Sequence, residues 1–198
     1  MRTIVFDTET SGFRPGNICQ LAYIIDDDGS ITGRNYFFKV DYVEPGAERV
    51  HGFSVEALGA LSGGQAFGTR ARSICDDFIA CPIWVAHNFY FDNSFLLAEC
   101  KRNGIMIAAE QYFCTMRHYT PIMKLPPNPA KLGASQYKYP SLSELMAFIG
   151  VSDDETAELA GDLFDWGDSG LCRHDARFDC AATYLCYKKG AAIGHGPD

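Results

Sequence analysis

The stretch Ile4-Val5-Phe6-Asp7-Thr8-Glu9-Thr10 places two acidic residues directly after an apolar run. The apolar run predicts a buried strand, and because side chains alternate along a strand, Asp7 and Glu9 are expected to point the same way. Neighbouring carboxylates repel each other unless a cation neutralises them, and such hard oxygen ligands favour Mg²⁺ or Mn²⁺. The segment predicts either a metal site or, as the alternative, a solvated turn after a strand.

Length and composition indicate one globular unit. The 198 residues, 47% of them hydrophobic, are enough to bury one substantial core. We expect a single domain over residues 1–190 and a short C-terminal tail over 191–198. No run of about 20 apolar residues is present, and the N-terminus leads straight into a strand rather than a signal sequence. The resulting expectation is a soluble, cytoplasmic protein without a membrane partner.

The eight cysteines include no Cys-x-x-Cys pair and mostly lie in apolar surroundings. Free buried thiols are therefore expected rather than disulfides or zinc ligands. The formal net charge of −8 argues against a protein that holds long nucleic acid through many phosphates. It does not exclude an enzyme that grips a few terminal nucleotides through metal ions.

The apolar patterns alternate between the periods of strands and helices, which favours a mixed α/β sheet covered by helices. Besides the first strand, strands are predicted over 18–26, 36–40 and 83–86. Helices are predicted over 54–61, 67–79, 93–103 and 175–189, with another that opens at the capping box Ser141-Leu142-Ser143-Glu144.

Two segments do not fit this pattern. Residues 120–140 are rich in Pro, Lys and Tyr and predict a long ordered loop that either touches phosphates and bases or is an ordinary surface loop. Residues 152–169 hold seven acidic residues and no Lys or Arg, which is typical of a solvated face or a mobile loop.

Two further acidic clusters follow downstream. A buried strand runs into His87-Asn88, and Asp92 follows where a helix begins, so Asp92 is either a helix cap or a group facing the same crevice as Asp7. His174 precedes a second helix whose first turn holds Asp175 and Asp179. These two carboxylates share one helix face, and their spacing does not decide which is a ligand.

Together these residues resemble the three Exo motifs of the DnaQ-like, or DEDDh, 3′ to 5′ exonucleases. The resemblance rests on Phe6-Asp7-Thr8-Glu9-Thr10, on His87-Asn88 with Phe91-Asp92, and on His174-Asp175-Ala176 followed by Asp179. The segment Val50-His51-Gly52-Phe53-Ser54 is similar to a family segment beside the terminal nucleotide. The resemblance implies a ribonuclease H-like fold, with residues 1–190 as the exonuclease domain.

The resemblance also implies roles for individual residues. Asp7, Glu9, Asp92 and Asp179 would bind two divalent ions, Mg²⁺ or Mn²⁺, and His174 would be the general base. Asp179 would then be the ligand and Asp175 the helix cap. Two carboxylate-bound ions suit phosphodiester hydrolysis because they activate water and neutralise the charge of the transition state. A histidine with an ordinary pKa of about 6.5 can accept the proton of that water.

Specificity for a chain end requires groups that enclose the 3′ terminus. Gly12 allows the backbone to approach the sugar. The rings of Phe13 and Phe53 can stack on bases of any sequence, although either ring could equally belong to the core. The candidate substrate-binding residues are Thr10, Gly12, Phe13, His51, Phe53 and Asn88.

The favoured hypothesis is a metal-dependent 3′ to 5′ exonuclease that acts on single-stranded nucleic acid, DNA before RNA, and releases nucleoside 5′-monophosphates. An RNA-trimming exoribonuclease or oligoribonuclease would use the same residues. A haloacid dehalogenase-type phosphatase would use Asp7 as nucleophile, but Glu9 and the His174/Asp179 pair count against it. A non-catalytic nucleic-acid-binding module is the last alternative. A polymerase or repair partner and a homodimer remain open.

Overall fold

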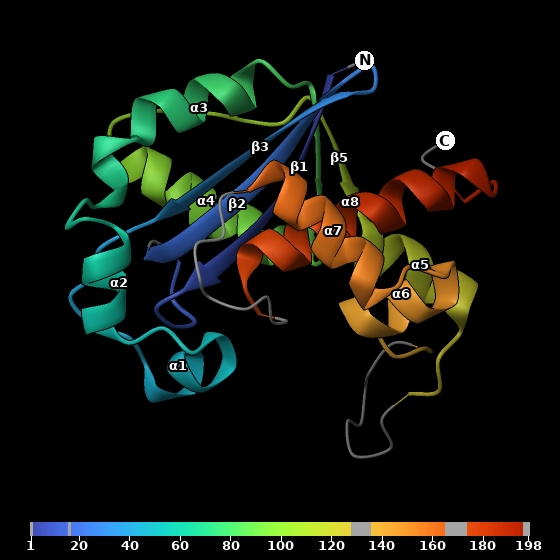
Figure 1. The fold of residues 1–198 in the computed structure, drawn as a ribbon. Helices are drawn as coiled ribbons and strands as arrows, with labels where there is room; N and C mark the ends of the chain where they lie inside the picture. Colours follow the sequence, from blue (N-terminus) through green and yellow to red (C-terminus); the bar gives the residue numbers. More distant parts are fainter. Residues whose placement is uncertain (1, 16, 128–135, 165–173, 196–198) are drawn as a thin grey trace.

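In the computed structural model, residues 2–15, 17–127, 136–164 and 174–195 are described. They form a five-stranded mixed sheet in the order β3-β2-β1-β4-β5 (Figure 1). β1 pairs antiparallel with β2 and parallel with β4, while β2–β3 is antiparallel and β4–β5 parallel. The strands are β1 (Arg2–Thr10), β2 (Ile18–Asp27), β3 (Ser30–Phe37), β4 (Ile83–Ala86) and β5 (Gln111–Cys114).

The central position of β1 follows from its composition. Ile4, Val5 and Phe6 are fully buried, because one face of the strand packs against one helical layer and the other face against a second layer. A strand that is buried on both faces reads as a continuous apolar run rather than an alternating one. The predicted α/β fold with an antiparallel meander and parallel strands is confirmed.

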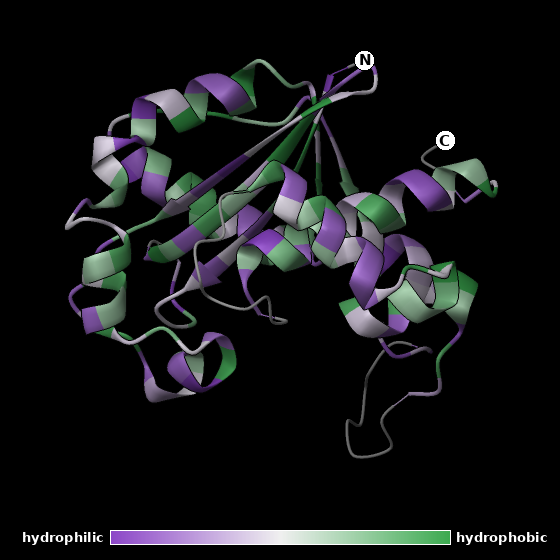
Figure 2. Ribbon diagram, in the orientation of Figure 1, coloured by the Kyte–Doolittle hydropathy of each residue, from purple (hydrophilic) through white to green (hydrophobic). Residues whose placement is uncertain are grey.

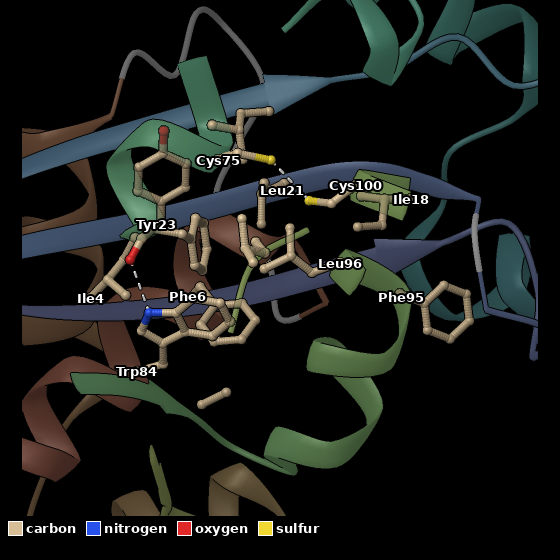
Figure 3. Packing of buried hydrophobic residues seen from close by; sticks show 14 of the residues in the cluster. Ile4, Phe6, Ile18, Leu21, Tyr23, Cys75, Trp84, Phe95, Leu96 and Cys100 are labelled. Atoms are coloured by element: carbon tan, nitrogen blue, oxygen red, sulfur yellow. Dashed lines mark hydrogen bonds between the residues drawn. The ribbon is translucent and has the colours of Figure 1, made fainter. Parts of the chain in front are cut away.

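One face of the sheet is covered by α3 (Ala71–Ile79) and α4 (Phe89–Arg102). Figure 3 shows the large side chains of this layer, with Phe6 and Trp84 in edge-to-face contact at 6.5 Å between ring centres. The indole N–H of Trp84 donates to the carbonyl oxygens of Phe78 and Cys81, so its polar atom is satisfied inside the core. The seven described cysteines are free thiols, including Cys75 and Cys100, whose sulfurs lie 3.1 Å apart.

The opposite face of the sheet is covered by α7 (Asp153–Leu163) and α8 (Ala176–Ala192). Small residues of α8, such as Cys180 and Ala181, pack against Val5 and Val85, which lets the helix approach the sheet closely. This close contact brings the first turn of α8 to β1. The other helices are α1 (Pro45–His51), α2 (Val55–Leu61), the 3₁₀ helix η1 (Phe67–Thr69), α5 (Thr115–Met123) and α6 (Leu142–Ile149).

Hydropathy follows this layering. Figure 2 shows apolar stretches along the central strands and mixed colours along the surrounding helices, as expected for helices with one buried face. Among the described helices, none is both long and apolar enough to cross a bilayer.

Several predicted elements differ from the structure. The third strand spans Ser30–Phe37 rather than 36–40, because it pairs with the full length of β2 from Asp27 back to Gln20. The helix predicted over 67–79 is divided into η1 and α3. The helix predicted from residue 93 begins at Phe89, and its N-cap residue is Asn88, so Asp92 is not the cap.

The two segments without an apolar pattern are also partly helical. Residues 153–163 of the acidic segment form α7 rather than a loop, because Ser152 caps the helix and Ala160 is buried against the sheet layer. Residues 120–123 of the predicted loop belong to α5, which contains Pro121. Residues 128–135 and 165–173, in the remainder of these segments, lie outside the described residues.

Candidate active site

Three carboxylates meet where β1 ends beside α8. Asp7 and Glu9 alternate with Thr8 along β1 and project toward the α8 face, as Val5 does. Asp179 lies in the first turn of α8. Each of the three acids offers an oxygen, and these oxygens all lie within 4.8 Å of one another. We call Asp7, Glu9 and Asp179 the acidic triad.

The electrostatics of the acidic triad disfavour three free charges. Burial raises the pKa of Asp7 well above its ordinary range, and the nearby carboxylates of Asp92 and Asp179 raise it further. Burial likewise raises the pKa of Glu9, with Asp179 as the next contributor. A divalent cation would remove the repulsion that these pKa shifts reflect, and oxygen ligands suit Mg²⁺ or Mn²⁺. The donor set therefore fits a metal ion.

Asp92 takes a different position from the acidic triad. Its Oδ1 accepts hydrogen bonds from the backbone N–H of Thr8 at 3.1 Å and from the Thr8 hydroxyl at 2.7 Å. The pairing of β1 with β4 ends at Val5, so Asp92 supplies the partner that the strand ladder does not. Burial raises the pKa of Asp92 to about 7, although the Thr8 hydrogen bonds lower it.

The residues before Asp92 shape the start of α4. Asn88 adopts a left-handed backbone conformation with φ of 67°, which Asn tolerates better than most residues. His87 contacts the Thr115 hydroxyl at 2.9 Å and the Pro140 carbonyl oxygen at 3.1 Å. Burial lowers the pKa of His87 to about 4. His87 thus joins β4 to α5 and to the segment before α6.

A buried polar network fixes the start of α8. Asp175 is the N-cap and accepts from the backbone N–H of Arg177 at 3.0 Å, as the sequence predicts. The Arg177 guanidinium donates to both carboxylate oxygens of Asp175, at 2.9 and 2.7 Å. Gln20 of β2 donates to Asp175 and accepts from the backbone N–H of Ala176. Because Asp179 lies one turn further on, this network sets its position relative to β1.

His174 lies at the open side of the acidic triad. Its side chain is 60% exposed, and its Nδ1 is 4.0 Å from Oδ2 of Asp179. The backbone of His174 is left-handed, with φ of 67°, a conformation that is uncommon for residues other than glycine. Strained backbone of this kind occurs preferentially at functional sites.

A mainly apolar pocket of about 180 Å³ lies beside the acidic triad. Four of the predicted substrate-binding residues line it, namely Thr10, Gly12, Phe13 and His51. The hydroxyl of Thr10 donates to the carbonyl oxygen of Gly12 at 2.9 Å, which braces the turn after β1. A side chain at Gly12 would meet the carboxylate of Glu44, so the Glu44 side chain would have to move to make room for it. Phe13 is 79% exposed and belongs to no core cluster.

His51 presents an unsatisfied polar atom at this pocket. Its Nδ1 accepts from the backbone N–H of Phe53 at 3.0 Å, whereas its Nε2 is buried and has no hydrogen-bond partner within the described parts of the chain. Burial lowers the pKa of His51, whereas the backbone of Thr10 acts in the opposite direction, so the imidazole already interacts with the turn after β1. Buried polar atoms are nearly always paired, and a nitrogen without a well-formed hydrogen bond is suited to a ligand.

Phe53 and Asn88 do not line the pocket. Phe53 stacks against the ring of His51 and makes an edge contact with Phe37, both at 5.3 Å between ring centres. It therefore supports His51 from behind. The sequence named Phe91 as part of the second motif but not as a pocket residue. It did not point to the Gln20 contact with Asp175, because Gln20 shows no signal beyond that of an ordinary strand residue.

No protein-family model matches the chain, and no curated protein matches its sequence. Its fold is similar to that of exonuclease I. The zinc-bound complex of E. coli exonuclease I with single-stranded DNA gives a TM-score of 0.71 at 19% identity, over 96% of this chain and 40% of that chain. The complex of exonuclease I with SSB-Ct gives 0.69 at 18% identity, over 96% and 41%. The chain thus spans about two fifths of the length of these structures.

Proposed function

We propose that the protein is a metal-dependent 3′ to 5′ exonuclease that hydrolyses single-stranded DNA and releases nucleoside 5′-monophosphates. The observation that carries the proposal is the acidic triad, since three carboxylates with oxygens within 4.8 Å of one another are held on a fold that is similar to exonuclease I. The presence of single-stranded DNA in that protein's complexes supports DNA as the substrate.

In this proposal the acidic triad holds the metal, and Asp92 is the fourth acidic ligand of the site. Two bound Mg²⁺ or Mn²⁺ ions would activate the attacking water and neutralise the charge that develops on the phosphate. The carboxylates of Asp92, Asp179 and Glu9 all raise the pKa of Asp7, so the four acids act on one another as a single cluster. The raised pKa values mean that metal binding displaces protons, so activity should increase as the pH rises.

His174 is the proposed general base. Its exposed imidazole lies 4.0 Å from the Asp179 carboxylate, beside the proposed metal ligands, where it can accept a proton from the attacking water. An exposed position allows the proton to pass to solvent after each turnover.

The pocket beside Glu9 is the proposed site of the 3′-terminal nucleotide. Phe13 and Phe91 offer apolar contacts, and His51 Nε2 offers a polar atom to the sugar or to the base. The turn that Thr10 and Gly12 form closes one side of the pocket. This arrangement would favour a chain end over an internal bond.

The test is a time course with matched DNA and RNA oligonucleotides that are labelled at the 5′ end, in Mg²⁺, Mn²⁺ or EDTA. We expect metal-dependent shortening from the 3′ end, faster for DNA, with Asp7→Ala as the inactive control. Faster shortening of RNA would assign the exoribonuclease function instead. No shortening of either strand in Mn²⁺ would refute the exonuclease proposal.

A further inference from the structure

Two tyrosines and an arginine form an exposed cluster at the edge of the sheet. Tyr90 belongs to the first turn of α4, Tyr112 to β5 and Arg117 to α5. The tyrosines are 44% and 52% exposed, and Arg117 is exposed as well. We call Tyr90, Tyr112 and Arg117 the edge cluster. The residues come from three elements, so the cluster exists only in the folded protein.

The contacts within the edge cluster hold the rings in fixed orientations. The Cζ of Arg117 lies 4.2 Å from the centre of the Tyr90 ring, and the hydroxyl oxygens of Tyr90 and Tyr112 lie 2.6 Å apart. The Tyr112 ring stacks on the buried Phe89 with 4.6 Å between ring centres and 15° between planes. Phe89 thus supports Tyr112 from the core side, while much of each tyrosine remains open to solvent.

The edge cluster is joined to the candidate active site by the start of α4. Tyr112 is in register with Trp84 and Ile4 on the α4 face of the sheet, and β5 lies two strands, or roughly 10 Å, from β1. Tyr90 directly precedes Phe91, which lines the pocket, and Asp92, which bonds to Thr8. The first turn of α4 thus contributes adjacent residues to the edge cluster and to the pocket.

We propose that the edge cluster is a stacking platform for the bases that lie 5′ to the terminal nucleotide. Aromatic rings stack on every base because each base has a π face, and a guanidinium adds a charge for the phosphates. A local cation matters in a chain with a net charge of −8, whose overall field repels nucleic acid. The proposal rests on the proposed function, because it assumes a polynucleotide that ends in the pocket.

If the edge cluster is a platform, the two tyrosines should increase the affinity for long substrates and leave the rate of the chemical step unchanged. In Mn²⁺, we expect Tyr90→Ala/Tyr112→Ala to raise KM for a single-stranded dodecanucleotide by roughly tenfold or more. The kcat and KM for a dinucleotide should change much less, because only one of its bases lies 5′ to the terminal nucleotide. Tyr42→Ala is the matched control, since Tyr42 is 64% exposed and lies outside the edge cluster.

Equilibrium binding separates the platform from the proposed function. The anisotropy of a labelled dodecanucleotide, measured in EDTA, should report weaker binding to the double variant than to the unaltered protein. Equal binding and equal KM would overturn the platform, as would an equal loss of activity on the dinucleotide, which would indicate a structural role. If the unaltered protein binds the strand but hydrolyses neither substrate, the proposed function fails, and the anisotropy difference alone decides the platform.

Discussion

Asp7 is a residue whose contributions to stability and to activity oppose each other. It stands with Glu9 and Asp179 in a site where burial and like charges raise its pKa. In Asp7→Asn we expect hydrolysis to fall by roughly 10³-fold, because the proposed metal site loses one of its ligands. The free energy of unfolding in EDTA should stay the same or increase, because the substitution removes a buried charge. Product release and urea denaturation measure the two effects. A large loss of stability in EDTA would contradict this view of Asp7.

His174 permits a test that separates chemistry from backbone strain. Its left-handed backbone suits Asn as well as His, so His174→Asn should keep the local conformation. We expect kcat to fall by roughly 10²-fold to 10⁴-fold, with metal affinity and KM nearly unchanged, because His174 as the proposed general base would act on the reacting water alone. Titration with Mn²⁺ and steady-state kinetics provide the measurements. Weaker Mn²⁺ binding in the variant would assign His174 to the metal site instead.

Among the elements, α8 depends on a buried ion pair at its start. Arg177 and Asp175 are each about 5% exposed and are joined by two hydrogen bonds. In Arg177→Met, the free energy of unfolding should fall by about 3 kcal/mol, because Asp175 is left as a buried charge with fewer partners. Activity should also fall, because Asp179 loses its fixed position. Denaturant unfolding and product release test both effects. Lys189→Met, which removes the half-exposed ion pair of Lys189 with Glu155 of α7, is the control and should change stability by less than about 1 kcal/mol.

The elements that the sequence predicts best are those with strong local signals. The strand at Val5, the capping box at Ser141 and the cap at Asp175 all appear as predicted. β5 went unpredicted because it is only four residues long and exposes Gln111 and Tyr112, so it shows little apolar pattern. α7 was not predicted because most of its residues are acidic or small, and only a narrow apolar stripe of the helix packs against the sheet. Elements of this kind are stabilised by tertiary packing more than by local sequence preference.

For the candidate site, the sequence predicted which residues gather, but not which of them lie in the acidic triad, in the pocket or behind it. Local alternation correctly placed Asp7 and Glu9 on one side of β1. It could not show that Asp92 would approach from α4 and bond to Thr8, because that contact depends on where β4 ends. Nor could it separate Phe13, which is exposed at the pocket, from Phe53, which packs behind His51. Such distinctions depend on contacts between distant parts of the chain.

At the scale of the whole molecule, stability should depend on metal and pH together. The raised pKa values of Asp7 and Glu9 mean that the metal-free folded state binds more protons than the unfolded state. Its free energy of unfolding therefore falls as the pH rises above about 4 through the raised pKa values. Mn²⁺ should restore the loss, so the difference in Tm between Mn²⁺ and EDTA should be larger at pH 8 than at pH 5.

The Tm difference between Mn²⁺ and EDTA is also free of the pH effect of His87, which is opposite in sign to that of Asp7 and Glu9. The lowered pKa of His87 gives stability that is present above pH 6.5 and is lost as the pH falls toward about 4. His87 lies outside the acidic triad, so its contribution is common to both metal conditions and cancels. A Tm difference that is the same at both pH values would show that protons and Mn²⁺ do not compete for the triad.

The acidic triad joins the first strand of the sheet to its last helix. Glu9 and Asp179 come from β1 and α8, which are far apart in the chain and meet only when α8 docks on the sheet. During synthesis on the ribosome, β1 is exposed long before α8 emerges. The nascent chain therefore lacks a complete acidic triad, and the proposed nuclease activity would appear only after the core has closed. Assembly of the fold would thus time the onset of activity without a separate inhibitor.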